Sequence, residues 1–177
     1  MSTKLIFTIL TFLLQALILF GQNSDDENSM SKLSFIVGEW HGKEWMMTKN
    51  GKQLSEVTEI AECKQNCNII IVTGLGIKTD SLTNKSQTVH DAFGVISFDK
   101  KAGKYMMRAY RNGEATDSEL KIISDKKIQW DISTSTGGKV RFTTDFNIRD
   151  KWTEIGEFSQ DEVKWMKMME MELVKKM

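Results

Sequence analysis

The sequence predicts an all-β fold, a single antiparallel and roughly ten-stranded closed β-barrel with a short N-terminal plug helix. Beyond about residue 30 the chain consists of alternating polar and apolar runs separated by short turns of Asn, Asp, Gly and Lys. Such short connectors require antiparallel neighbours, because parallel strands need crossovers of about a dozen residues. We expect no helix long enough to cover a sheet, which favours a closed barrel without edge strands.

The N-terminus has the pattern of a secretory signal peptide. Lys4 precedes sixteen mostly apolar residues, 5–20, and Gly21 follows them. The apolar stretch is short for a membrane span and contains polar residues, so we expect cleavage rather than an uncleaved anchor, which is the alternative. The predicted protein is exported, to the periplasm or beyond the cell, with no membrane span after cleavage. The predicted division is a signal peptide at 1–21, a disordered polar segment at 22–30 and the barrel domain at 31–177.

Charge and length narrow the class of protein. The chain has 24 basic and 24 acidic residues, and removal of 1–21 deletes one lysine and no acid, leaving 23 − 24 = −1. This balance predicts neither nucleic acid nor an anionic membrane as a partner. About 155 residues remain, the length of one ordinary domain.

The elements follow from local signals. Ser31 is a suitable cap for a short helix over 32–37, and Gly38 can end it in the left-handed conformation. The predicted strands are 39–47, 54–63, 67–77, 87–98, 104–111, 118–123, 127–134, 139–148, 151–158 and 163–175.

Alternation within the strands indicates one apolar and one wet face. In 139–148, the residues Val140, Phe142, Phe146 and Ile148 share a face. The opposite faces of most strands carry charges, so we expect a barrel with its apolar face inside rather than toward lipid. A barrel of this size holds either one small ligand or a packed interior.

Cys63 and Cys67 are the two cysteines of the chain, and they flank the short turn between two strands. A redox pair usually has two intervening residues, and a structural zinc site needs four ligands. In an exported protein we therefore expect a structural disulfide and no metal site.

Gly38 and Trp40 form the motif G-x-W at the start of the first strand, after a short helix. This arrangement resembles the lipocalins of the calycin superfamily. With Gly42 and the apolar last strand at 169–176, it is similar to bacterial exported lipocalin-like proteins distantly related to nitrobindin. That resemblance implies haem bound by a histidine of the last strand, where this chain has none.

Met168 and Met169 lie nearest the place of that histidine, and a methionine sulfur can bind haem iron. Haem bound through Met168 or Met169 is thus an alternative implied by the resemblance, and no other cofactor is expected. The two histidines do not suggest catalysis. His41 should point outward if Trp40 points inward, and His90 does not face its neighbour Asp91 on a strand. Gly42 is expected where two strands approach closely. Whether the protein is an enzyme stays open, with a non-enzymatic role favoured.

The favoured hypothesis is an exported, non-enzymatic barrel that binds a small apolar ligand. The alternatives are a haem-binding, nitrobindin-like protein or enzyme, and a filled barrel that acts as a protein-interaction module. Arg108 is a possible inward charge for a ligand carboxylate, and Glu154 a second possible inward polar group. The expected apolar lining is Trp40, Met107, Trp130, Phe142, Phe146, Trp165 and Met169.

Overall fold

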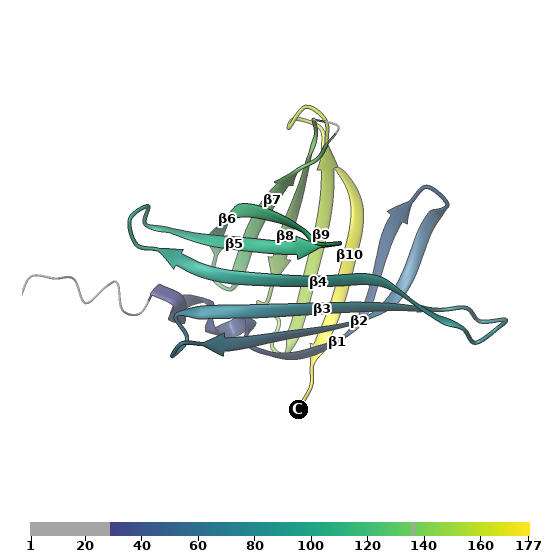
Figure 1. Ribbon diagram of the computed structural model, residues 1–177, viewed down its shortest axis with the longest axis horizontal. Coiled ribbons are helices and arrows are strands. Elements are labelled where there is room, and N and C mark those ends of the chain that lie inside the picture. Colours follow the sequence, from purple (N-terminus) through teal and green to yellow (C-terminus); the bar gives the residue numbers. More distant parts are fainter. Residues whose placement is uncertain (1–28, 136) are drawn as a thin grey trace, which may run out of the picture.

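The computed structural model describes residues 29–135 and 137–177, and the predicted signal peptide and most of the predicted polar segment lie outside this range. Ten antiparallel strands close into one barrel in the order β1-β10-β9-β8-β7-β6-β5-β4-β3-β2 (Figure 1). The predicted all-β fold class is confirmed. The elements are η1 (Ser29–Ile36), β1 (Gly38–Thr48), β2 (Gly51–Lys64), β3 (Ile69–Thr79), β4 (Ser86–Asp99), β5 (Lys104–Arg111), β6 (Glu114–Ser124), β7 (Lys127–Ser133), β8 (Lys139–Asp145), β9 (Lys151–Ser159) and β10 (Met166–Lys175).

The plug helix η1 is a 3₁₀ helix that begins at Ser29, two residues before the predicted start of the barrel domain. Met30, Leu33 and Ile36 are its buried residues. The Tyr105 hydroxyl donates a hydrogen bond to the Ser29 carbonyl at 2.6 Å, which attaches the beginning of η1 to the wall. Burial of Met30 explains why η1 starts before the predicted helix, which was expected to begin at residue 32.

Trp40 joins the helix to the barrel wall. Its indole Nε1 donates to the Ile36 carbonyl at 2.9 Å, and its ring packs edge-on against Phe146 and Trp152, with centroids 5.4 and 5.8 Å away. Lys175 Nζ lies 5.1 Å from the Trp40 ring centroid. The aromatic core is therefore concentrated at the plugged end.

The seam between β1 and β10 closes the barrel. Trp40 is paired with Lys175, and Gly42 with Leu173. A Cβ atom at Gly42 would overlap the Glu172 carbonyl oxygen and lie 2.9 Å from the Leu173 Cα, so the close approach expected at Gly42 is confirmed. Any larger residue here would push the two closing strands apart.

Among the strand boundaries that differ from the prediction, the end of β8 and the start of β10 have clear local causes. β8 ends at Asp145, whose Oδ1 accepts a hydrogen bond from the Asn147 backbone N–H at 2.8 Å and turns the chain. Ile148, predicted on the inner face, is 64% exposed. β10 starts at Met166 because the Asp161 carboxylate accepts the Val163 and Lys164 backbone N–H groups at 2.9 Å, which forms a turn instead of strand.

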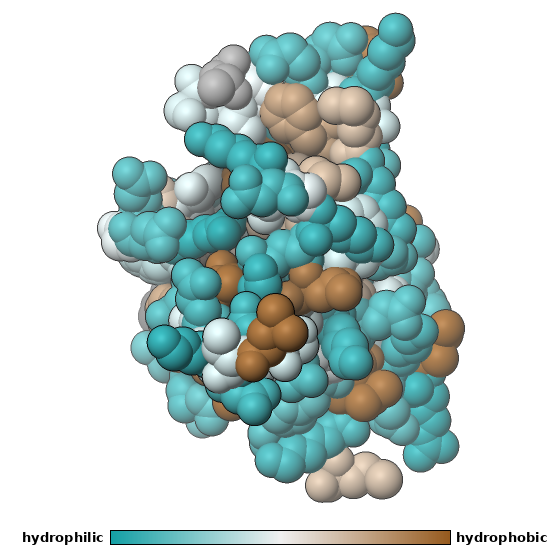
Figure 2. All heavy atoms as spheres, turned by 90° about the vertical axis from the view of Figure 1, so that its right-hand side faces the viewer, coloured by the Kyte–Doolittle hydropathy of each residue, from teal (hydrophilic) through white to brown (hydrophobic). Residues whose placement is uncertain are grey.

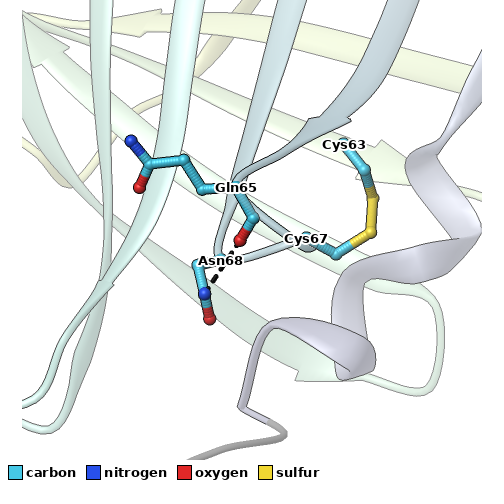
Figure 3. Close-up of a disulfide and its surroundings, with 4 residues drawn as sticks. All are labelled: Cys63, Gln65, Cys67 and Asn68. Carbon is cyan, nitrogen blue, oxygen red and sulfur yellow. Dashed lines mark hydrogen bonds between the residues drawn. A yellow bond between two sulfur atoms is a disulfide. The ribbon is translucent and has the colours of Figure 1, made fainter.

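The predicted disulfide between Cys63 and Cys67 is present, and it spans the turn between β2 and β3 (Figure 3). Asn68 Nδ2 donates to the Gln65 carbonyl at 2.8 Å across this turn. Gln65, Asn66 and Cys67 all have positive φ, a conformation that costs energy in residues other than glycine. The bridge helps to hold this strained turn.

We expect Trp40→Ala to lower the free energy of unfolding by about 3–5 kcal/mol, because it removes a large buried ring and leaves a cavity. Urea denaturation followed by circular dichroism measures this. Trp45→Ala, on the half-buried outer position of the same strand, is the matched control and should cost about 1 kcal/mol. Equal losses in the two variants would contradict the central position of Trp40.

Replacing both cysteines with serine should lower the free energy of unfolding by about 2 kcal/mol, from the loop-closure entropy of so short a ring. Urea denaturation of the double variant, compared with the wild type before and after reduction, measures this. The variant and the reduced wild type should coincide. A reduced wild type as stable as the oxidised protein would contradict a structural role for the bridge.

Candidate functional site in the open half of the barrel

The two ends of the barrel differ. η1 lies at one end, whereas the β1–β2 and β3–β4 hairpins project from the other (Figure 1). Figure 2 looks onto the side from which these hairpins project and shows a largely hydrophilic surface with hydrophobic patches between the polar side chains. The interior on the side of the Trp40 cluster away from η1 is called the open half below and contains the candidate site. Glu59 lies at its border, because it is paired with Trp40 across β1 and β2.

One wall of the interior is made of small residues. Gly74 and Gly76 of β3 lie beside Ala92 and His90 of β4 in the antiparallel register. Gly94 is buried, yet a Cβ atom placed there would have its nearest neighbours at 3.9–4.0 Å, from Val72 and Met107. Gly94 thus adds no side chain to the interior, and a Cβ atom fits there in ordinary van der Waals contact.

The facing wall is aromatic and rich in methionine. Trp130 and Phe142 stack with their ring centroids 4.2 Å apart and their planes at 17°. The Phe142 ring covers Gly156, where a Cβ atom would lie 3.3 Å from it and 3.2 Å from the Met169 Cβ. Trp130 and Phe142 are only partly buried, so this apolar surface is accessible from solvent.

Three glutamates occupy inward positions between these walls. Glu44 is 5% exposed, Glu59 7% and Glu154 9%. Ser55 Oγ donates to Glu44 Oε1 at 2.9 Å, and Thr144 Oγ1 donates to Glu154 Oε2 at 2.6 Å. The inward position considered for Glu154 is confirmed.

Glu59 differs from the other two acids because its carboxylate accepts no hydrogen bond within the described part of the chain. It lies over Gly74, where a Cβ atom would overlap it. Burial, followed by the charges of Glu154 and Glu44, raises the pKa of Glu59 from 4.5 to about 8. Burial likewise raises the pKa of Glu154 to about 7, although its bond from Thr144 acts in the opposite direction.

His90 completes the cluster from β4. Its Nε2 lies 3.9 Å from Glu59 Oε1, and its Nδ1 is buried without a hydrogen-bond partner. Burial lowers the pKa of His90, which favours the neutral ring at neutral pH. His90 and three inward acids thus face the same interior, and the positive charge of Arg111, at the last inward position of β5 beside Ala92 of β4, acts on His90.

The residues expected to line a ligand site divide into three groups. Trp130, Phe142 and Met169 lie in the open half. Trp40 and Phe146 belong to the aromatic core at the plugged end. Met107 is buried at an inward position beside Gly94, between these two regions.

Arg108 and Trp165 lie elsewhere, and their expected inward positions are corrected. Arg108 points outward on β5 and forms a two-pronged ion pair with Asp117 of β6, with both N–O distances 2.6 Å. Trp165 precedes β10, donates to the Glu162 carbonyl at 3.2 Å and stacks under the Arg141 guanidinium at 3.9 Å. In each case a charged partner on the outer face holds the side chain outside.

Glu44, Glu59 and His90 are not among the residues that the sequence predicts to line a ligand site. The pattern that could have identified the two glutamates is the alternation of inward and outward residues along a strand. Glu44 lies on the same face of β1 as Trp40, and Glu59 lies between the inward residues Val57 and Ala61 of β2. Ordinary burial statistics assign glutamate to the surface, which hid this signal.

His41 points outward as expected, and both of its ring nitrogens have partners: Glu39 at 2.8 Å and the Thr58 hydroxyl at 3.0 Å. It borders a surface groove of about 530 Å³ between β1, β2 and β10, whose rim is a mixture of charged and apolar side chains. Lys151 of β9 and the buried Glu44 also contribute to the lining of this groove.

Chemically, the open half can bind a molecule with an apolar body and a polar group that meets carboxylates. No group of three potential metal ligands in the described ranges is arranged to hold a metal ion. Nor is any helix among those residues long and apolar enough to cross a membrane.

No protein-family model and no curated protein sequence matches the chain. In structure it is similar to the S-type phycobiliprotein lyase CPES from Guillardia theta, with a TM-score of 0.54 and 12% identity over 89% of this chain and 95% of that one. A DUF3598-family protein of unknown function from Nostoc punctiforme aligns with a TM-score of 0.28 and 7% identity, over 83% of this chain and 98% of that one. The first likeness shows the fold alone, a closed β-barrel.

We expect the free energy of unfolding to fall as the pH rises from about 5 to about 8, because folded Glu59 retains a proton that the unfolded chain has lost. In Glu59→Gln this part of the slope disappears. The change in unfolding free energy over this pH range should then differ from that of the wild type by a few kcal/mol, because each unit of pKa shift corresponds to about 1.4 kcal/mol. His90 acts in the opposite direction below its ordinary pKa of 6.5, and the variant leaves this contribution in place.

Urea denaturation at a series of pH values measures these slopes. Glu56→Gln, at an exposed position of β2, is the matched control and should reproduce the wild-type slope. If both variants keep that slope, Glu59 does not hold its proton in the folded state.

Proposed function

We propose that this chain is an exported, non-enzymatic binding protein that holds a small ligand with an apolar body in the open half of the barrel. The observation that carries the proposal is the partly exposed Trp130–Phe142 stack at inward positions of β7 and β8, opposite the inward glycines of β3 and β4. A barrel evolved only as a filled scaffold would fill inward positions with large side chains, because empty interior volume is destabilising.

The binding energy would come mainly from burial of apolar surface, at about 25 cal/mol per Å². Trp130 and Phe142 already form a flat surface against which an apolar ring could stack. Met46 and Met169, which are paired across the β1–β10 seam, add flexible walls that adapt to ligand shape. These features support a carrier or a sensor of a small molecule.

The calycin-like fold is compatible with this role, since small closed barrels hold single ligands in their interior. The structural neighbour is a phycobiliprotein lyase, but at 12% identity that activity is not carried over to this chain. Export is proposed on the N-terminal sequence pattern, and the disulfide is consistent with an oxidising compartment.

Haem is not proposed, because the donor set does not favour it. Met169 is packed against Gly156 near a β-bulge, and the inward histidine His90 lies against Glu59.

We expect the neutral fluorescent probe phenylnaphthylamine to bind the wild type, and Gly94→Leu to weaken its binding about tenfold or more by occupying the interior space. A Cβ atom fits at position 94, so this variant should fold. Fluorescence titration gives the affinities, and native mass spectrometry of protein from its own compartment tests for a ligand acquired there.

Val95→Leu, at the outward neighbouring position of β4, is the matched control and should bind as the wild type does. Loss of probe binding in both variants, or in neither, would place the probe outside the barrel interior. A wild type that binds no probe and carries no ligand would contradict the proposed function.

A further inference from the structure

Glu59 is a largely buried acid without a close partner in the described part of the chain, although its oxygens are not among the fully buried atoms that lack a hydrogen bond. The residue is 7% exposed, accepts no hydrogen bond there, and has its nearest basic atom, His90 Nε2, at 3.9 Å. Buried polar groups in proteins are almost always hydrogen-bonded, so an exception needs an explanation. A ligand donor is such an explanation when the group faces accessible space.

The backbone around Glu59 is shaped to keep it in this position. Gly74, its direct neighbour on β3, leaves room for the carboxylate, because any Cβ atom there would overlap it. A Cβ at Gly76 would in turn meet His90 and lie 3.3 Å from Glu44 Oε1. Two glycines therefore form a cradle that admits both acids and the histidine.

The charges that face this cradle come from several strands and are mainly negative. The inward groups are Glu44 on β1, Glu59 on β2, His90 on β4 and Glu154 on β9. β3 contributes glycines, β8 Thr144 and β10 Met169 and Met171, none of them charged. Arg111 at the exposed end of β5 and Asp91 on the outer side of β4 also affect His90.

This balance distinguishes between ligand classes. Above the pKa values of Glu59 and Glu154, about 8 and about 7, an anion would be repelled by the ionised acids in this buried site, where charges interact strongly. A metal ion is disfavoured, because no group of three ligands among the described side chains is arranged for one. A protonated nitrogen can donate a hydrogen bond to the Glu59 carboxylate, and its positive charge balances the negative charge of the ionised acids.

We propose that the open half binds a small organic cation, a protonated amine on an apolar body, with the Glu59 carboxylate as its counter-ion and Glu44 and Glu154 as supporting acids. The inference rests on the proposed function and specifies its ligand class. Met46, two residues from Glu44 on β1, connects the acids to the methionine and aromatic wall through Met169. The amine would thus meet the carboxylates while the apolar body contacts Met169, Phe142 and Trp130.

Binding of such a cation is coupled to proton release. Because burial holds the pKa of Glu59 at about 8, the free protein carries a proton there at neutral pH, and the cation must displace it. Affinity for the amine should therefore increase with pH up to about 8 and then level off. His90, already neutral in this range because its pKa is lowered, contributes little to the slope.

Isothermal titration calorimetry with naphthylethylamine and its neutral isostere naphthylethanol tests the proposal at pH about 8.5, where an alkyl amine is still protonated. The wild type should bind the amine about tenfold or more tightly than the alcohol. Glu59→Gln should reduce this preference to about one, with alcohol binding unchanged. Glu56→Gln, an exposed acid on the same strand, should keep the full preference.

The outcomes separate this inference from the proposed function. If wild type and Glu59→Gln both bind the two probes equally, the cation proposal is wrong and a neutral-ligand carrier remains. Tighter binding of naphthylacetate than of the amine would also overturn it, in favour of an anionic ligand. If none of the probes binds and phenylnaphthylamine does not bind either, both proposals fail. A thermal unfolding curve for Glu59→Gln verifies that the variant is folded.

Discussion

The contact of Trp40 with η1 and the last strand is the interaction on which the rest of the structure depends. The indole bonds to the Ile36 carbonyl, and Lys175 of β10 extends across its face and donates to the Val37 carbonyl at 2.8 Å. One residue thereby connects the plug, the first strand and the last strand. Since β1 and β10 are far apart in sequence, their pairing carries a large loop-closure cost, which apolar burial at this end must offset.

Because the aromatic core at one end supplies much of the apolar burial, the other end can be packed less well and the fold stays stable. The plugged end contains the Trp40, Phe146 and Trp152 cluster, whereas the open half carries glycines and buried acids. Buried acids without strong partners and empty volume both reduce stability. Such local costs are typical of functional sites, where the surrounding fold maintains an arrangement that would not be favourable alone.

The fold and the site carry different information about function. The barrel fold is shared with a lyase at 12% identity, so the barrel by itself specifies a container and not a reaction. What distinguishes this chain is the chemistry of the interior: three inward glutamates, a neutral histidine beside them and a stacked aromatic pair opposite small residues. The proposed ligand class follows from these side chains.

The sequence alone determined the antiparallel barrel, the disulfide and the inward position of Trp40, because strand alternation, short turns and cysteine spacing are local signals. It could not decide Arg108 or Trp165, whose positions depend on Asp117 and Arg141 in other strands. Nor could it reveal that Glu44, Glu59 and Glu154 converge. Three acids separated by many residues come together only when β1, β2 and β9 curve around one axis, and the burial that raises the pKa of Glu59 exists only in that closed barrel.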